Sequence, residues 1–205
     1  MEHHRIGEHD VTFDPINHQY TVDGTPVFSV TQIIDEILEK PYKNVDPVIL
    51  EKAAEKGLHL HDMIEHYERF GKKTYHPEMQ GYLALKTQYQ INVLKSEQIV
   101  LLYHNGIVIA AGRFDMVVSS PYMKGLGIVD VKRMAHLDEP RLKLQLNLYK
   151  LGYEQTYKEN IDYLKCLHIR NRYKRYVDVS VDRAYANKLI NLYLNKHPID
   201  YSKYY

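Results

Sequence analysis

The sequence predicts an α/β protein in which helices flank a mixed central sheet. Two observations favour this class. Short runs rich in β-branched residues, such as 128–131, alternate with stretches whose apolar residues recur at helical spacing, such as 139–157. The turn dipeptides Asp23-Gly24 and Asn105-Gly106 separate pairs of short strand-like runs, a pattern typical of β-hairpins.

Length and composition indicate an ordinary globular protein. The 205 residues favour one compact domain, with a core over 48–205 and an N-terminal hairpin and helix added over 1–47. Hydrophobic residues make up 44% and charged residues 26% of the chain. The net charge of +1 provides no general attraction to nucleic acid, so any such attraction must come from local patches.

The single cysteine, Cys166, excludes a disulfide within the chain and a four-cysteine metal cluster. Its isolation fits a reducing compartment. No apolar run reaches the ~20 residues of a membrane span, and the N-terminus lacks an apolar signal segment. We therefore expect a cytoplasmic protein that does not enter a membrane.

The N-terminal region is predicted to begin with a loose polar stretch over residues 1–11. A β-hairpin follows over 12–28, with Asp23-Gly24 as its turn. Ser29 and Gln32 have the spacing of a capping box, so Ser29 is expected to cap a helix that ends near Leu38. The segment 41–47 is predicted to be a linker.

A long helix is expected from Val48 to Phe70, with Gly71 as its C-cap. His61 and Glu65 lie four residues apart, so they are neighbours on one helix face. Gly57 on this face is expected to allow close approach of another backbone or of a ligand. A buried histidine with an ordinary hydrogen-bond partner is the simplest interpretation of His61 alone. The predicted inward stripe also contains Leu50, Ala54, Leu58 and Ile64.

Two strands that carry acidic residues are the centre of the prediction. Runs 113–118 and 127–132 are separated by turn residues and are expected to be antiparallel neighbours. Asp130 and Lys132 are two residues apart and should point the same way. Asp115 and Asp130 should then lie close together, where two carboxylates repel unless a proton or cation lies between them. Oxygen ligands of this kind suit Mg²⁺ or Mn²⁺.

The preceding strand is predicted to begin at Glu97, after a helix over 78–90. The residues alone favour a surface charge at Glu97 over a place in the site. In the helix predicted over 139–157, Gln145 and Tyr149 share a face. A buried amide such as that of Gln145 needs partners, whereas Tyr149 alone would be interpreted as core packing.

Two further strands are predicted over 163–169 and 176–181, joined by the turn 170–175. Four of the six turn residues are cationic. They form the one concentrated positive patch of the sequence, and the pattern suits a clamp on a DNA backbone and a solvated turn equally well. The four cations are Arg170, Arg172, Lys174 and Arg175.

The ordered series GRFD (112–115), IVDVK (128–132) and QLNLY (145–149) resembles the PD-(D/E)XK nuclease superfamily, in its RecB-like branch. The resemblance covers about residues 50 to 180 and implies a restriction-endonuclease-like core and a divalent-metal-dependent DNA nuclease. The N-terminal phrases HQYTVDG and FSVTQII resemble phage-encoded recombination exonucleases. They imply an exonuclease of DNA recombination or repair from a phage or its bacterial host, with a recombinase or single-strand-binding partner and a possible homo-oligomer.

The resemblance also implies roles for individual residues. The pattern GLHLHDMIE (57–65) is similar to the helix that precedes the catalytic strands in this branch, which makes His61 a metal ligand and Glu65 a supporting residue. Further ligands would be Asp115, Asp130 and the backbone carbonyl of Val131. Lys132 would orient or deprotonate a water or stabilise phosphate charge, Gln145 and Tyr149 would support the lysine and contact DNA, and Glu97 matches an acid that many relatives carry.

Two alternatives remain open at this point. One is a non-catalytic module that binds nucleic acid or a partner on the same fold, because one fold hosts many functions. The other is an endonuclease of the same superfamily. The chain lacks the GxxxxGK[ST], HExxH and GxSxG patterns, which disfavours other phosphoryl-transfer enzymes and hydrolases.

Overall fold

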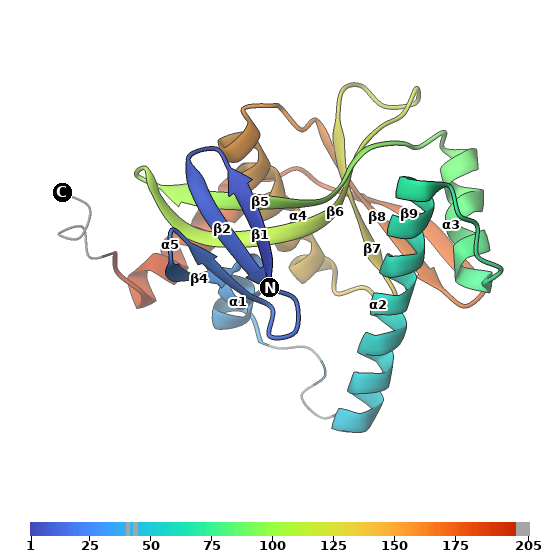
Figure 1. The fold of residues 1–205 in the computed structure, drawn as a ribbon, viewed down its shortest axis with the longest axis horizontal. Helices are drawn as coiled ribbons and strands as arrows, with labels where there is room; N and C mark the ends of the chain where they lie inside the picture. The colour runs from blue at the N-terminus through green and yellow to red at the C-terminus, as the bar shows by residue number, and fades with distance from the viewer. Residues whose placement is uncertain (40–41, 43–44, 200–205) are drawn as a thin grey trace.

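The computed structural model describes residues 1–39, 42 and 45–199 (Figure 1). The predicted linker over 41–47 and the C-terminal tail fall partly outside this range. In chain order the elements are β1 (Glu2–Ile6), β2 (His9–Asp14), β3 (Gln19–Val22), β4 (Thr25–Ser29), α1 (Val30–Ile37), α2 (Pro47–Phe70), α3 (Pro77–Gln88), β5 (Asn92–His104), β6 (Ile107–Ser119), β7 (Gly127–Lys132), α4 (Glu139–Tyr157), β8 (Tyr163–Arg170), β9 (Tyr173–Val179) and α5 (Arg183–Lys196).

The sheet is mixed, as the sequence predicts. Strands β5, β6 and β7 are antiparallel neighbours, β7 and β8 run parallel, and β9 is antiparallel to β8. Helix α4 makes the crossover between the parallel pair, because parallel neighbours cannot be joined by a tight turn. This confirms the α/β class with a mixed sheet flanked by helices.

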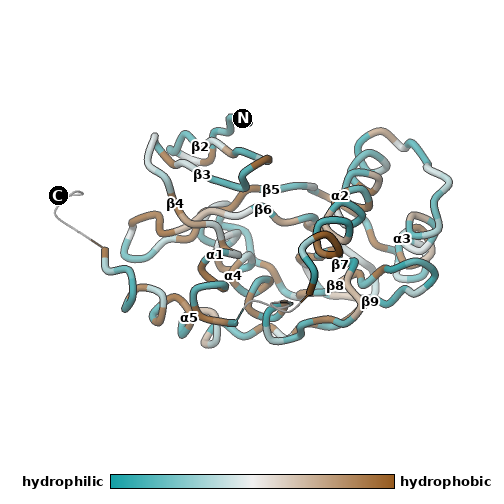
Figure 2. Tube along the Cα trace, turned by 90° about the horizontal axis from the view of Figure 1, so that it is seen from below, coloured by the Kyte–Doolittle hydropathy of each residue, from teal (hydrophilic) through white to brown (hydrophobic). Residues whose placement is uncertain are grey.

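Three apolar clusters hold the layers together. Figure 2 shows how these layers are arranged, with the chain coloured by hydropathy. Helices α1, α4 and α5 cover one face of the sheet. On the opposite face, α2 and α3 pack over β6, β7 and β8, and the strands β2 and β3 pack over β5 and β6. These two layers flank the middle of β5 and β6, where Glu97 and Asp115 lie.

The N-terminal segment is more ordered than the sequence suggests. The prediction of a loose start over residues 1–11 is wrong, because β1 pairs with β2 from Glu2 opposite Phe13 to Ile6 opposite His9. The predicted hairpin is confirmed as β2, β3 and β4, and the last of these joins the core sheet through Phe28 and Ala110. The Ser29 capping box is also confirmed.

Helix α2 matches its predicted bounds but not its predicted inward face. Asp46 caps its start and Gly71, with φ 66°, ends it. In its first half Leu50 is 36% and Leu58 66% exposed, because this half projects beyond the sheet (Figure 1). Only the second half is buried in the core, through Leu60, Met63 and Ile64. No other described element approaches Gly57: outside its own helix, no described atom lies within 4 Å of the position of an added Cβ. Gly57 instead lines an open groove.

The β8–β9 turn is shorter than predicted. Strand β9 begins at Tyr173, so only residues 171 and 172 lie between the strands. Lys174 and Arg175 are consecutive strand residues and therefore point to opposite faces of the sheet. The four cations of this region do not form a single patch. Within the described residues, no helix is both long and apolar enough to cross a bilayer.

Candidate functional site

The site forms where β6 and β7 separate. Their ladder of backbone pairs ends with Met116 opposite Val129. Beyond this point the carboxylate of Asp115 takes the place of a backbone acceptor, and the Val131 N–H donates to its Oδ2 at 2.6 Å. The gap between the strands therefore fixes Asp115 at a position that groups from both faces of the sheet can reach.

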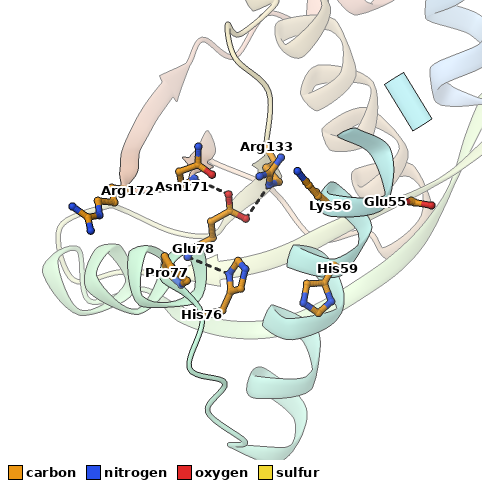
Figure 3. Close-up of a pocket in the computed structure, with 9 residues that line it drawn as sticks. All are labelled: Glu55, Lys56, His59, His76, Pro77, Glu78, Arg133, Asn171 and Arg172. Carbon is orange, nitrogen blue, oxygen red and sulfur yellow. Dashed lines mark hydrogen bonds and ion pairs between the residues drawn. The ribbon is translucent and has the colours of Figure 1, made fainter. Parts of the chain in front are cut away.

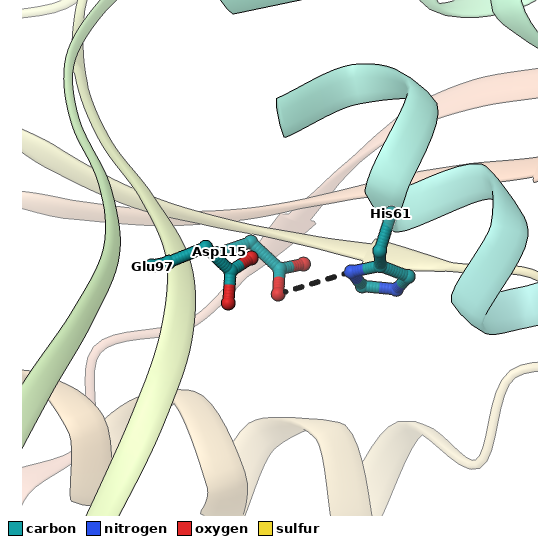
Figure 4. A group of neighbouring side chains, drawn as sticks. All are labelled: His61, Glu97 and Asp115. Atoms are coloured by element: carbon teal, nitrogen blue, oxygen red, sulfur yellow. Dashed lines mark ion pairs between the residues drawn. The ribbon is translucent and has the colours of Figure 1, made fainter. Parts of the chain in front are cut away.

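The buried half of α2 brings His61 to this gap. Its Nδ1 lies 3.3 Å from Asp115 Oδ1. Donor atoms of His61, Glu97 and Asp115 all lie within 4.8 Å of one another (Figure 4). A cavity of about 10 Å³, close to the volume that holds one water molecule, is lined by these three residues and Val131. One imidazole and two carboxylates thus converge on a space of ionic size.

Glu97 belongs to this group, so the sequence-based preference for a surface charge is wrong. Its side chain is 18% exposed, and Arg113 Nε lies 2.9 Å from its Oε2. Ser96 pairs with Met116 and Gln98 with Phe114, which places Glu97 opposite Asp115. Its φ of +50° is unusual for a non-glycine residue inside a strand. Backbone strain of this kind is found preferentially at functional sites.

Asp130 and Lys132 point the same way, as predicted. Lys132 Nζ lies 2.7 Å from Asp130 Oδ2, and the two side chains are 23% and 3% exposed. Among the described residues, Asp130 lies outside the group of three close donors. Burial raises the pKa of Asp130, and the neighbouring Asp115 raises it further. Burial alone would lower the pKa of Lys132, but the carboxylates of Asp130 and Asp115 raise it above its usual value.

Charge interactions shift the other groups of the site. Burial opposes protonation of His61, but the Asp115 carboxylate outweighs it and raises the pKa of His61 from 6.5 to about 9. Burial and the nearby Asp115 raise the pKa of Glu97 from 4.5 to about 7. Burial also opposes ionisation of Asp115, yet His61 and Lys132 hold the pKa of Asp115 below its usual value. In the absence of a bound metal ion, His61 and Glu97 therefore hold protons more tightly than usual.

Helix α4 supports the site from the opposite face of the sheet. Gln145 Nε2 donates to the Tyr149 hydroxyl at 3.2 Å, as their shared helix face predicts. Burial and the nearby Asp130, Asp115 and Glu97 raise the pKa of Tyr149 well above its usual value. A Cβ at Gly112 would lie 2.8 Å from the Tyr149 ring, so this glycine lets the tyrosine pack directly against β6.

A groove leads away from the cluster beside the projecting half of α2. One wall is apolar and comes from Ile49, Leu50, Ala53 and Ala54. The other wall comes from the end of β7, the loop after it and the end of β8, and it carries Lys132, Arg133 and Arg170. His61 and Val131 lie at the same groove, whose volume is about 500 Å³. Of the predicted clamp, Arg170 lines the same groove as His61 and Lys132.

Arg133 also lines a second pocket, of about 590 Å³, on the other side of α2 (Figure 3). There the buried Glu78 accepts from Arg133 Nε at 2.9 Å and from the Asn171 N–H at 2.6 Å. Arg172 lies at the pocket, whereas Lys174 lies with its aliphatic stem against Gly81 of α3 and Arg175 is exposed. The sequence analysis missed Arg133, although its position next to Lys132 was a usable signal.

The predicted supporting residue Glu65 lines the ion-sized cavity and forms an ion pair with Arg69 at 2.9 Å. Arg113 is a further residue that the sequence analysis did not assign. It is part of the GRFD series, and its position two residues before Asp115 on one strand was the signal available.

Comparisons with known proteins do not define a family. No family model matches the chain, and no curated protein matches it. One solved structure with partial similarity is titled "Crystal structure of SSO0001", with 14% identity and a TM-score of 0.36, over 72% of this chain and 86% of that one. Its likeness is too low to support an argument about function.

Proposed function

We propose that the protein is a divalent-metal-dependent DNA nuclease built on a restriction-endonuclease-like core. The observation that carries this proposal is the convergence of His61, Glu97 and Asp115 on an ion-sized cavity, next to the buried pair Asp130 and Lys132. An acid cluster with a lysine at its side is the arrangement expected for hydrolysis of a phosphodiester.

The donor set fits Mn²⁺ well and Mg²⁺ acceptably. Carboxylate oxygens suit both ions, whereas an imidazole ligand favours Mn²⁺. The Val131 carbonyl is a further candidate ligand, because the N–H and C=O of one strand residue face the same strand edge and its N–H already points to Asp115. When bound here, a divalent ion would lower the pKa of a water and neutralise charge on the scissile phosphate.

The position and charge of Lys132 define its role. Because the adjacent Asp130 raises the pKa of Lys132, its Nζ holds a proton near neutral pH. A protonated lysine stabilises the negative charge that develops on the phosphate and can donate a proton to the leaving oxygen. Asp130 keeps the ammonium group in place. This favours charge stabilisation over removal of a proton from water by Lys132.

The groove supports a nucleic acid as the substrate. Its wall of Lys132, Arg133 and Arg170 can neutralise phosphates. Its opposite wall, formed by Ile49, Leu50 and Ala53, offers an apolar surface to sugars and bases. Because His61 lies at the same groove, a strand bound there would pass beside the proposed metal ligands.

The experiment that tests the proposal is digestion of end-labelled linear DNA and closed circular DNA, single- and double-stranded, with Mg²⁺, Mn²⁺ or a chelator. We expect cleavage with a metal and none with the chelator. Asp115→Asn keeps the size of the side chain and should reduce the rate by at least about 10²-fold. Asp10→Asn, an exposed control that is 76% exposed, should cleave at the wild-type rate. Equal rates for Asp115→Asn and wild type would refute the proposal.

The substrates in this assay also separate the two nuclease modes. Loss of label only from free ends indicates an exonuclease of DNA recombination or repair, which is the mode we propose. Cutting of closed circles indicates an endonuclease.

A non-catalytic binding module is the second candidate, because the cationic groove alone would retain DNA. Binding without cleavage in every metal tested would favour that function.

A further inference from the structure

The charges around the ion-sized cavity bear on how many metal ions the site holds. Asp115, Glu97, Asp130 and Glu65 supply four carboxylates. Lys132 neutralises Asp130 at 2.7 Å, and Arg69 neutralises Glu65 at 2.9 Å. Arg113 neutralises another, because its Nε lies 2.9 Å from Glu97 Oε2. One net negative charge remains, and His61 adds none when neutral. A single divalent ion together with one phosphodiester would balance this charge.

Arg113 is held in place from the N-terminal sheet. Its guanidinium lies over the ring of Phe13, with 4.6 Å between the guanidinium carbon and the ring centroid. A second contact joins its Nη1 to Glu2 Oε2 at 3.4 Å. Phe13 is on β2 and Glu2 on β1. A planar guanidinium stacked on an aromatic ring and paired with a carboxylate is a fixed cation rather than a mobile surface group.

We infer that this site holds one divalent ion, and that Arg113 serves as the second cation on Glu97. The inference rests on the proposed function and specifies its metal requirement. A second divalent ion on Glu97 would have to lie beside the fixed guanidinium at the 2.9 Å contact, where like charges repel strongly at low dielectric. The cavity of about 10 Å³ also has room for only one ion. Arg113 is thus a positioning residue, which sets the charge and orientation of a ligand.

The test is a titration of Mn²⁺ into the metal-free full-length protein, with free Mn²⁺ followed by its electron paramagnetic resonance signal. Wild type should bind one Mn²⁺ per chain at saturation. Arg113→Gln removes the cation that neutralises Glu97, so the variant should bind a second, weaker Mn²⁺. Arg113→Lys keeps the charge and should bind one. Arg5→Gln is the matched control, because Arg5 is exposed and pairs with Asp10.

Two bound ions in wild type would overturn the inference and leave the proposed nuclease intact, provided that the same preparation cleaves DNA. One ion in Arg113→Gln, with a wild-type circular dichroism spectrum, would overturn the role given to Arg113. If Arg113→Gln does not fold, the wild-type stoichiometry still decides the number of ions. Absence of any binding in wild type would overturn both the inference and the proposed function.

Discussion

At the scale of single residues, the proposed metal ion would compete with protons for the same groups. The folded protein raises the pKa of His61 to about 9 and that of Glu97 to about 7. Both groups therefore bind protons more tightly when folded than when unfolded. For a histidine with a raised pKa, the added stability is complete below the unfolded value of 6.5 and is lost as pH rises through about 9.

This competition predicts a pH-dependent stability of the metal-free protein. Between pH 6.5 and 9 the melting temperature of wild type should fall more steeply than that of His61→Ala, because the variant has no proton to lose at this position. Mn²⁺ should stabilise wild type more at pH 9 than at pH 6. At pH 6 the ion must displace protons from His61 and Glu97, whereas at pH 9 fewer protons are bound there. With a chelator present, an equal fall of the melting temperature with pH in the two proteins would contradict the raised pKa of His61.

The Asp130 and Lys132 pair gives a second prediction at this scale. Lys132→Met leaves Asp130, 3% exposed, without its cation. Loss of one partner from a buried pair typically costs about 3 kcal/mol, and urea unfolding measures this loss. The double variant Asp130→Asn/Lys132→Met should recover most of it, because it carries no unpaired charge. If the double variant is less stable than Lys132→Met, the unpaired charge of Asp130 is not the cause of the loss of stability in Lys132→Met.

At the scale of elements, α2 has two halves with different surroundings. The second half is packed in the core and brings His61 to the site, whereas the first half projects and forms one wall of the groove. Helical periodicity predicted the helix and its Gly71 cap correctly. It could not show where the sheet ends beneath the helix, which is why Leu50 and Leu58 were wrongly placed in the core.

The glycines of the protein provide a contrast between free and crowded positions. Gly57 has open space around it in the interior of α2, so Gly57→Ala should stabilise the protein by about 0.5–1 kcal/mol. At Gly127 of β7 an added Cβ would lie 2.0 Å from the Tyr163 ring. Gly127→Ala should therefore destabilise by about 1–3 kcal/mol. Chemical denaturation measures both changes, and the same sign for the two would contradict the packing described here.

The acidic strands show which parts of a site the sequence specifies. Side-chain alternation along β7 was enough to place Asp130 and Lys132 together, and the hairpin-like spacing was enough to pair β6 with β7. The Asn105-Gly106 turn was enough to pair β5 with β6. The position of the Glu97 side chain was not predictable, because it depends on a backbone φ of +50° within β5. An irregular backbone angle of this kind cannot be predicted from the pattern of apolar residues in the sequence.

At the scale of the whole molecule, the N-terminal sheet is part of the site. The segment 1–47 was predicted as an elaboration of one compact domain. Its strands pack on β5 and β6 and hold Arg113 through Phe13. The sequence alone could not reveal this role, since the contact between Phe13 and Arg113 joins segments far apart in the chain. The helices and strands were largely predictable, whereas contacts across layers were not.

The groove makes a prediction about DNA binding by the whole protein. Arg170→Glu should weaken binding and lower the slope of log Kd against log salt by about 0.7–0.9, as expected when one phosphate contact is lost. Lys188→Glu makes the same charge change on an exposed position of α5 and should leave the salt dependence unchanged. If the two substitutions weaken DNA binding equally, the overall charge of the protein attracts DNA and the groove is not a specific binding site.

The central claim is that the ion-sized cavity and Lys132 together hydrolyse a phosphodiester. The most direct test is the single-turnover rate of cleavage of a labelled DNA strand at saturating Mn²⁺, for wild type and Lys132→Gln, with Mn²⁺ binding measured on the same samples. We predict that the variant still binds Mn²⁺ at the cavity and that it cleaves about 10²–10⁴-fold more slowly than wild type. Equal rates in the two proteins, or no cleavage by wild type, would contradict the claim.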